Sequence, residues 1–433
     1  MKIIRLLLLL SLFILYPALN VLSAQSQNVY YGYVPLKAGY PTAKLYIIGD
    51  RDDTKVQVFS LPDLKLIADF KINKMEEKTL EFSNGSFFKI VSDKAVTAIL
   101  AGGSEVSKGI RSITTFFTSV NGGYVGREFI FRSFVRGEGP GAFTVYAIED
   151  SEIKIYDSSG SQVMNFKVPP RGFKDFNLKP FEVYRLVSTG RVMFQSFAQK
   201  APGSWGGITR WSSYAIPSPE GSFMGRYFYV RGAFPGPYKV YTDYILTSNQ
   251  KSAVNIYNLD AGAILKREEI PETGNLTFKS LKVHLFFQSE KPVALMIFAN
   301  DGGLIVFGLK KGQTTRICIP SEEAYALSPK DAVLILDGAK YSLSRDEPFK
   351  LPSGTHEISA QENIIILMVD YGSVMSLPSF GSCLPSIQTL SIEYPNLKVA
   401  APRAEFPWLT VIGAVATIAV IAAVLILLRR MRR

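Results

Sequence analysis

The stretch FTVYAIEDSEIKIYDSSGSQVMNFKVPPRGFKDFNLKPFEVYRLVSTGRVMFQSF, residues 143–197, decides how the rest of the chain is interpreted. It consists of short runs rich in β-branched and aromatic side chains, and each run is closed by Gly, Pro, Ser or Asp. We expect strands over residues 143–148, 152–156, 163–168, 173–178, 183–187 and 192–197. Runs of this length and composition, joined by tight polar turns, are typical of successive antiparallel strands. The stretch therefore predicts an all-β protein.

A related pattern recurs along most of the chain, which indicates internal repeats. A strand–turn–strand segment occurs at residues 45–59, 144–156, 244–257 and 325–336, and its second strand carries a β-branched pair: Val56/Val58, Ile153/Ile155, Val254/Ile256 and Val333/Ile335. A Ser-x-x-x-Val turn follows at 92–96, 188–192 and 289–293, with a decayed copy at 360–364. A Gly-Arg pair opens an aromatic-rich strand at 126–131 and again at 225–230. We predict four double units, about residues 30–125, 126–224, 225–313 and 314–390.

Two architectures fit these units, and no convincing amphipathic helix interrupts them between Gln25 and Pro407. Connections as short as Glu149-Asp150 and Ser158-Ser159-Gly160 favour pairing of strands that are neighbours in sequence, which is a meander. The chain also lacks the Pro/Ser/Thr-rich or charged linkers that usually separate independent domains. A closed β-propeller-like array of repeated antiparallel meanders is therefore the favoured prediction. Tandem immunoglobulin-like β-sandwiches remain the alternative.

Two segments of the first repeats carry a family resemblance. FFKIVSDKAVTAILAGG (residues 87–103) and TTFFTSVNGGYVGREFIF (residues 114–131) resemble the N-terminal domain family of IgG-Fc-binding proteins, in which a Ser-Asp-Lys-Pro-like turn precedes a Gly-x-Glu-Phe/Tyr strand. The proline of that turn is Ala95 in the first copy and Pro292 in the third. The resemblance covers repeats over roughly residues 30–370 and implies an extracellular binding or adhesion module. No IgG-binding residue is carried over, because the matched positions are structural.

The two ends of the chain predict export and anchoring. Lys2 and Arg5 precede an apolar run, and a small-residue cleavage site lies at 22–24, so residues 1–24 are expected to be a signal peptide rather than a buried first helix or an uncleaved anchor. Residues 408–428 carry no charge and would span about 31 Å as a helix, which suits a transmembrane helix better than a buried soluble helix. A juxtamembrane linker (391–407) precedes this span, and a basic tail (429–433) follows it. The arginines of the tail predict a single-pass type I protein of the cell membrane with an extracellular ectodomain.

Charge and cysteine content narrow the class of protein. The formal net charge is +11, but six basic residues lie in the signal peptide and the tail, which leaves an ordinary ectodomain surface and no footprint for nucleic acid. Cys318 and Cys383 are the only cysteines. A disulfide between them would close a loop of about 65 residues and contribute roughly 4 kcal/mol, whereas the alternative is two free buried thiols. Asn84 and Asn275 each begin a glycosylation sequon at a predicted turn, so the protein is a candidate glycoprotein.

Residue patterns that would support catalysis are scarce. His284 and His356 are the only histidines, and each lies in a predicted strand of a different repeat, outside any recognisable nucleophile or zinc motif. The acidic segment 50–53 is interrupted by Arg51 and lacks the distal glutamate of a calcium loop, so we interpret it as a solvated turn. We therefore expect no metal, no cofactor and no enzymatic activity.

The best candidate for binding is a segment with Trp205, Arg210, Trp211 and Tyr214, whose rings and guanidinium would suit a sugar or a protein side chain. Alternatively, the tryptophans fill a core. The sequence predicts a membrane-anchored cell-surface protein with a non-catalytic binding or adhesion ectodomain, whose partner is a surface protein, a glycan or a second copy of the chain. Alternatives are an anchored extracellular polysaccharide hydrolase or lyase, and a structural component of a cell-surface layer.

Overall fold

The computed structural model confirms the all-β class. It describes residues 27–38, 42–102, 114–134, 141–197, 213–231, 243–279, 283–299, 302–372 and 380–394, with a few positions between 416 and 429. Strands β1 to β30 form six antiparallel sheets, and a short 3-10 helix, η2 (Thr389–Ser391), follows the last strand.

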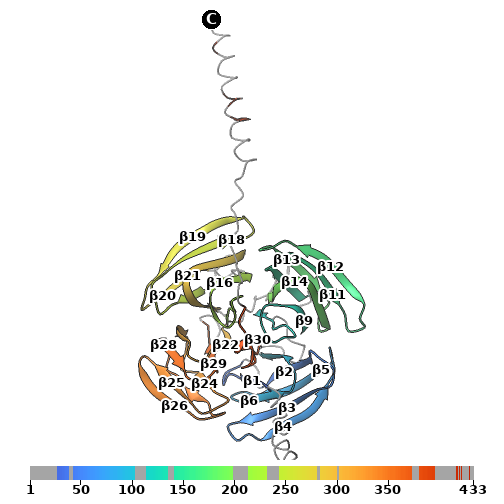
Figure 1. The fold of residues 1–433 in the computed structure, drawn as a ribbon, viewed down its shortest axis with the longest axis vertical. Helices are drawn as coiled ribbons and strands as arrows, with labels where there is room; N and C mark the ends of the chain where they lie inside the picture. The colour runs from blue at the N-terminus through green and yellow to red at the C-terminus, as the bar shows by residue number, and fades with distance from the viewer. Residues whose placement is uncertain are drawn as a thin grey trace, which may run out of the picture.

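The strands group into four units that surround a common centre (Figure 1). Unit 1 contains β1 (Asn28–Tyr33), β2 (Thr42–Gly49), β3 (Thr54–Leu61), β4 (Leu66–Ile72), β5 (Glu77–Ser83), β6 (Phe87–Ser92), β7 (Val96–Gly102) and β30 (Phe380–Cys383). Unit 2 contains β8 (Thr115–Phe116), β9 (Gly126–Arg132), β10 (Gly141–Ala147), β11 (Ser151–Tyr156), β12 (Gln162–Val168), β13 (Phe173–Leu178) and β14 (Val183–Phe197). Unit 3 contains β15 (Tyr214–Ala215), β16 (Met224–Arg231), β17 (Asp243–Thr247), β18 (Ser252–Asn258), β19 (Ala263–Ile270), β20 (Asn275–Lys279) and β21 (His284–Phe298). Unit 4 contains β22 (Gly303–Leu309), β23 (Thr314–Ile319), β24 (Ala324–Leu327), β25 (Ala332–Leu336), β26 (Ala339–Leu343), β27 (Phe349–Lys350), β28 (Gly354–Ala360) and β29 (Ile364–Asp370).

All four units share one pairing scheme, most easily followed in unit 1. Strand β2 pairs with β5 and β7, whereas β3 pairs with β4 and β6. In units 2 and 3 the equivalents of β6 and β7 are merged into the long strands β14 and β21. Two further strands complete each unit, and in units 2 to 4 they come directly before it in the sequence.

Unit 1 is completed from both ends of the chain. Strand β1 pairs with β6, as β9, β16 and β23 pair with their counterparts in the other units. Strand β30 pairs with β7 and so occupies the position that β8, β15 and β22 occupy elsewhere. Because β30 is the C-terminal strand, its pairing with β7 closes the four units into a ring.

The strands were predicted well, but the expected meander is only partly right. Strands β11 and β12, joined by Ser158-Ser159-Gly160, pair with each other as predicted. Strands β10 and β11, joined by Glu149-Asp150, do not pair with each other; each pairs with β14 instead. The predicted turn at 188–192 is a shift of register inside β14, where the strand leaves β9 and β11 and continues along β10 and β8. A propeller of four-stranded meanders is therefore not found. Separate tandem sandwiches do not describe the structure either, since the first unit needs a strand from the far end of the chain.

The unit boundaries in the structure also differ from the predicted ones. Positions 126, 225 and 314 fall at or inside β9, β16 and β23, whereas the repeat begins one strand earlier, at β8, β15 and β22. The strands β8 and β15 contain only two residues each, so the sequence carries no pattern that would have marked them.

Burial follows the position of each strand in the ring. The inner strands β7, β22 and β29 are buried along their whole length, because neighbouring strands cover both of their faces. The outer strands β4 and β12 keep most residues exposed or half-buried. This gradient explains why the inner strands have uninterrupted apolar sequences and the outer ones mix polar and apolar residues.

The β-branched pairs predicted in the first three units point into the core, but the pair in unit 4 does not. Val56, Ile153 and Val254 lie opposite Ser92, Ser188 and Ser289 and are buried. In unit 4, Ala360 takes the place of these serines, and the residue opposite it is Leu334. Leu334 and Leu336 are buried, whereas Val333 and Ile335 are only half-buried. The predicted register is thus displaced by one residue in unit 4. Because side chains alternate between the two faces of a strand, this displacement exchanges the buried face and the exposed face.

A β-bulge recurs in the outer hairpin of three units. The register shifts between Val58 and Phe59, between Ile155 and Tyr156, and between Ile256 and Tyr257. The residues left without a partner on the outer strands are Ile67, Val163 and Leu265, and all three are exposed. Bulges on edge strands disrupt the hydrogen-bonding row that another chain would extend. We infer that these bulges limit edge-to-edge association of the outer strands.

The predicted signal peptide (1–24) and the linker residues 395–407 lie outside the described residues, as does most of the apolar span 408–428. Within the part of the chain that is described, no helix has both the length and the apolar character needed to cross a membrane.

Candidate functional site

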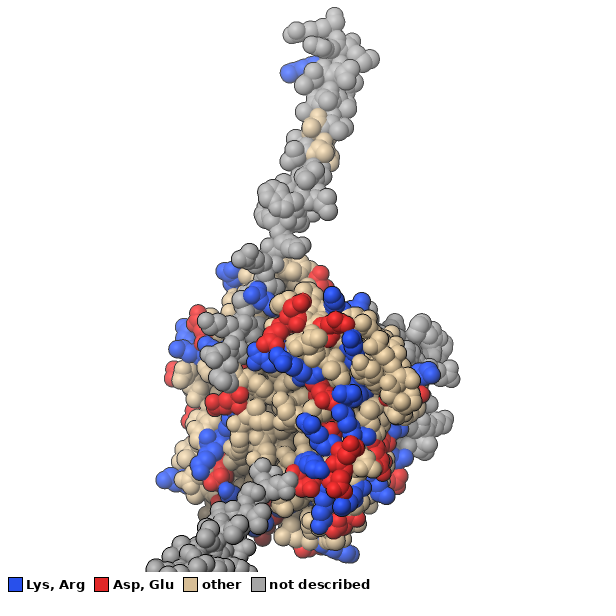
Figure 2. Space-filling model, turned by 45° about the vertical axis from the view of Figure 1, so that its right-hand side comes forward, with Lys and Arg blue, Asp and Glu red and all other residues tan. Residues whose placement is uncertain are grey.

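Polar side chains gather where one unit meets the next. Each of the four joints contains a contact that links two units: Lys74–Glu128 at 2.6 Å, His284–Asp175 at 2.7 Å, Thr247 Oγ1–Arg316 O at 2.5 Å and Lys89–Asp346 at 2.8 Å. Elsewhere on the face shown in Figure 2, basic and acidic side chains are interspersed, so no broad surface of one sign is seen there. The joints between units are therefore the places where polar groups are concentrated.

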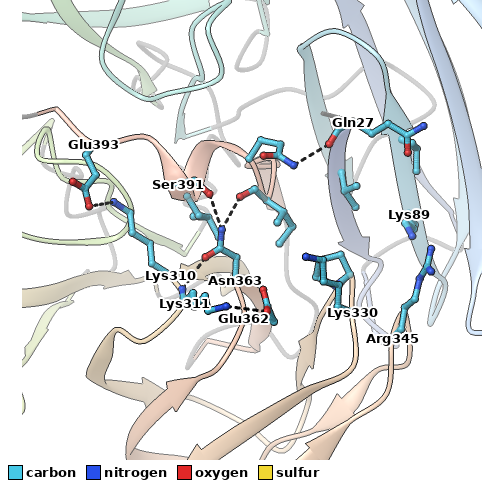
Figure 3. A pocket seen from close by; sticks show the side chains of 16 residues that line it. Gln27, Lys89, Lys310, Lys311, Lys330, Arg345, Glu362, Asn363, Ser391 and Glu393 are labelled. Carbon is cyan, nitrogen blue, oxygen red and sulfur yellow. Dashed lines mark hydrogen bonds and ion pairs between the residues drawn. The ribbon is translucent and has the colours of Figure 1, made fainter. Parts of the chain in front are cut away.

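The joint between units 4 and 1 contains a pocket of about 680 Å³, which we call the basic pocket (Figure 3). Sixteen residues line it: Gln27, Val29, Lys89, Val91, Lys310, Lys311, Pro329, Lys330, Arg345, Glu362, Asn363, Ile387, Gln388, Leu390, Ser391 and Glu393. They come from β1 and β6 of unit 1, from several turns of unit 4, and from the segment 387–393 that follows β30. The pocket therefore exists only because the ring is closed.

Asn363 holds the segment 387–393 in place as one wall of the pocket. Its Nδ2 donates to the carbonyl of Ile387 at 3.3 Å and to Oγ of Ser391 at 2.8 Å (Figure 3). On the opposite side, Gln388 Nε2 donates to the carbonyl of Gln27 at 3.1 Å. The end of the folded ring is thus attached to both units that form the pocket.

The pocket carries more positive than negative charge. On one side, Lys311 pairs with Glu362 at 3.1 Å, and Lys310 lies 3.9 Å from Glu393. Burial lowers the pKa of Lys310 because the ammonium loses water, and the nearby Glu393 only partly offsets this effect. These two lysines are balanced by two carboxylates.

The other side of the pocket holds Lys89, Lys330 and Arg345, which lie near one another in Figure 3. Two described carboxylates lie beside these three cations. Asp346 is 1% exposed, accepts Lys89 Nζ at 2.8 Å through both oxygens and Arg345 Nε at 3.2 Å, and accepts a hydrogen bond from Tyr31. The exposed Asp331 accepts a hydrogen bond from the backbone N–H of Arg345 at 2.8 Å. Lys330 is exposed, and the Arg345 side chain is 65% exposed. The excess positive charge is therefore located at Lys330 and Arg345, where a ligand could reach it.

His284 is buried in the joint between units 2 and 3. Its Nε2 lies 2.7 Å from Asp175 and its Nδ1 lies 3.0 Å from Asp260, while Phe173 stacks on the ring at 3.6 Å. Burial alone would raise the pKa of Asp175, but its hydrogen bond and ion pair with His284 hold the pKa below its usual value. Thr144 Oγ1 also donates to Asp175 at 2.6 Å, and Arg231 Nε lies 3.5 Å from the same carboxylate. Because these groups bind one another across the two units, we interpret the cluster as a structural joint. His356 pairs with Asp337 at 2.6 Å in unit 4.

The predicted aromatic binding segment is only partly described. Trp205, Arg210 and Trp211 lie outside the described residues. Tyr214 belongs to β15, is buried, and its hydroxyl accepts a hydrogen bond from Gln195 Nε2 at 3.0 Å. Tyr214 therefore belongs to the core and offers no surface for a ligand.

The remaining predicted positions are spread over the ring. Cys318 on β23 and Cys383 on β30 are free thiols, so the predicted disulfide is not formed in the structure. Asn84 is half-buried and donates to the carbonyl of Ala38, whereas Asn275 is exposed at the start of β20.

The acidic segment 50–53 contains a buried residue instead of a fully solvated turn. Asp50 is 1% exposed and accepts a hydrogen bond from Thr97. Burial raises its pKa well above the usual value, and the hydrogen bond only partly opposes this. Among the described residues, no group of three or more His, Cys, Asp or Glu side chains could hold a metal ion.

Neither a family model nor a curated protein matches this sequence. Among solved structures, the cryo-EM reconstruction of native E. coli alpha-2-macroglobulin aligns with 79% of this chain at 10% identity and a TM-score of 0.12. This chain spans 27% of that protein. A TM-score this low carries no argument about fold or function. The resemblance to the IgG-Fc-binding family stays a prediction.

The basic pocket could not be found from the sequence, because its charged residues are far apart in the chain. Lys89 belongs to the first unit and Arg345 to the last, and they meet only because unit 4 lies beside unit 1. The one local signal is the pair Lys310-Lys311 in the turn between β22 and β23.

Proposed function

We propose that this chain is a membrane-anchored cell-surface protein with a non-catalytic binding ectodomain, and that the basic pocket receives an acidic group of its partner. The observation that carries the proposal is the excess of accessible positive charge at Lys330 and Arg345 inside a concave site. Such a site attracts carboxylate, sulfate or phosphate groups, and an arginine can bind them through two parallel hydrogen bonds.

The lining of the pocket supports binding over catalysis. No histidine or cysteine is among its sixteen residues. Both of its carboxylates, Glu362 and Glu393, are paired with lysines, at 3.1 Å and 3.9 Å. A glycosidase needs two carboxyl groups that face each other across a substrate cleft, whereas each of these faces a lysine.

The location at the cell surface rests on the sequence. The proposed signal peptide (1–24) and the proposed span 408–428 would place the ring outside the cell. Its partner would then be a component of the cell surface that bears acidic groups, namely another surface protein, a glycan or a lipid.

The test is capture of intact envelope material by the full chain held in nanodiscs of neutral lipid. The wild type is compared with Lys330→Gln/Arg345→Gln, which removes the two accessible charges, and with the control Lys340→Gln/Arg267→Gln, which removes two exposed charges on outer strands. We expect the pocket variant to capture about tenfold less, as loss of roughly 1.4 kcal/mol of charge-assisted bonding implies, and the control to match the wild type. Equal capture by both variants would refute the proposal.

A further inference from the structure

We infer that the acidic group bound by the basic pocket is the phosphate of an anionic lipid in the membrane that anchors the chain. This inference rests on the proposed function and names the ligand of the same site. It draws on the position of the pocket relative to the end of the ring, on the charge of its open side and on the chemistry of its lining.

The pocket lies at the point where the chain leaves the ring. Residues 387, 388, 390, 391 and 393 line it, and the continuously described ring ends at Tyr394. Only 13 residues (395–407) separate Tyr394 from the proposed span that begins at Trp408. Fourteen Cα–Cα steps of a fully extended chain reach at most about 50 Å, so Tyr394, beside the pocket, stays within that distance of the proposed span.

The charge of the pocket suits a membrane surface. Lys330 and Arg345 are exposed on the side where three cations, counting Lys89, outnumber two carboxylates, the buried Asp346 and the exposed Asp331. Anionic lipids attract nearby Lys and Arg side chains, and this attraction falls off over a Debye length of about 8 Å. Two such residues would therefore favour a docked orientation of the ring by about thirtyfold, because the tether raises the local concentration of the pocket at the membrane surface.

The lining favours a phosphate over a sugar. None of the sixteen described lining residues is Trp, Tyr or Phe, so the pocket offers no ring on which a sugar could stack. Its uncharged part includes the half-buried Val29 and Val91 as well as the polar Gln27, Asn363, Gln388 and Ser391. Cationic side chains together with polar hydrogen-bonding groups suit the phosphate and the polar part of a lipid headgroup.

The experiment measures how fast Lys330 is acetylated in the full chain. One sample is held in nanodiscs of phosphatidylcholine, and a second in nanodiscs that also contain phosphatidylglycerol. Lys340 on the outer strand β26 is exposed, lies outside the pocket and serves as the internal control. We expect Lys330 to react several-fold more slowly in the anionic discs, Lys340 to react equally in both, and high salt to remove the difference. Arg345→Gln is expected to weaken the protection.

Further arms separate the lipid from other sources of the same chemistry. Inorganic phosphate and a sulfated polysaccharide are added to the neutral discs. Protection of Lys330 by either of these, with none from anionic lipid, would overturn the inference while leaving the proposed function standing. Equal reactivity of Lys330 in the two kinds of disc would also overturn it. If in addition Lys330→Gln/Arg345→Gln captures envelope material like the wild type, the proposed function fails as well.

Discussion

Lys89→Met removes the cation from the buried ion pair that joins units 4 and 1. The Lys89 side chain is 8% exposed and Asp346 is 1% exposed, so water cannot replace the lost contact. Both carboxylate oxygens lie 2.8 Å from Lys89 Nζ, and after the substitution only Tyr31 and the exposed Arg345 remain as partners. Removing one partner of a buried pair costs about 3–5 kcal/mol, because the other charge stays buried without compensation. We expect a loss of about 3 kcal/mol, since Tyr31 and Arg345 retain part of the bonding.

The assay is urea denaturation of the full chain, followed by far-UV circular dichroism. The double variant Lys89→Met/Asp346→Asn removes both buried charges of the pair and leaves only the exposed Arg345 beside residue 346, so it should recover most of the lost free energy of unfolding. Asparagine also tolerates the positive φ of 61° that residue 346 adopts. Lys340→Met, on an exposed outer strand, serves as the control and should change the free energy of unfolding by less than about 0.5 kcal/mol.

The reasoning would be refuted if Lys89→Met destabilised the protein no more than Lys340→Met does. It would also be refuted if the double variant were less stable than Lys89→Met alone, because the penalty would then not arise from an uncompensated carboxylate. Either result would mean that units 4 and 1 do not meet through this pair.

Two further predictions concern the core and the second joint. Leu334→Ala should lower the free energy of unfolding by about 2–5 kcal/mol, whereas Val333→Ala on the other face of the same strand should cost about 1 kcal/mol or less, as measured by denaturation with urea. At the joint of units 2 and 3, burial would raise the pKa of Asp175, but His284 holds this pKa below its usual value. The Asp175 carboxylate therefore stabilises the fold above its unfolded pKa of about 3.8. This contribution to stability is lost as the pH falls through the lower folded pKa. Asp175→Asn should accordingly weaken the decline of the urea midpoint between about pH 5 and pH 2, and an unchanged decline would contradict the assignment.

The strands were predictable because each is a local pattern. The residues expected to form strands at 152–156, 163–168 and 173–178 lie within β11, β12 and β13. Their partners were not predictable, because the same alternation suits any neighbour, and a short loop such as Glu149-Asp150 can turn the chain into another part of the sheet without pairing the two strands.

The candidate site depends entirely on contacts between distant parts of the chain. Lys89 and Asp346 are separated by 257 positions, and no local pattern relates them. The aromatic segment was predicted to bind a ligand because tryptophan and arginine often mark binding surfaces. Tyr214, the one member that the structure describes, packs in the core instead. The sequence predicted Val333 in the core of unit 4, whereas the structure buries Leu334. Both faces of that strand carry aliphatic residues, so hydrophobicity alone cannot select between them.

The most direct test of the closed ring uses the native Cys383 on β30. The residue opposite it on β7 is Ile99, and directly opposed residues of antiparallel strands have Cα atoms about 4.5–5.5 Å apart, which a disulfide can bridge. Under mild oxidation, Ile99→Cys should give a cross-link between positions 99 and 383, detected by mass spectrometry of non-reduced peptides. The control Ala101→Cys, opposite Gly381, should give none. Absence of the cross-link in Ile99→Cys, or its formation with Cys318 instead, would contradict the closure of the ring by its C-terminal strand.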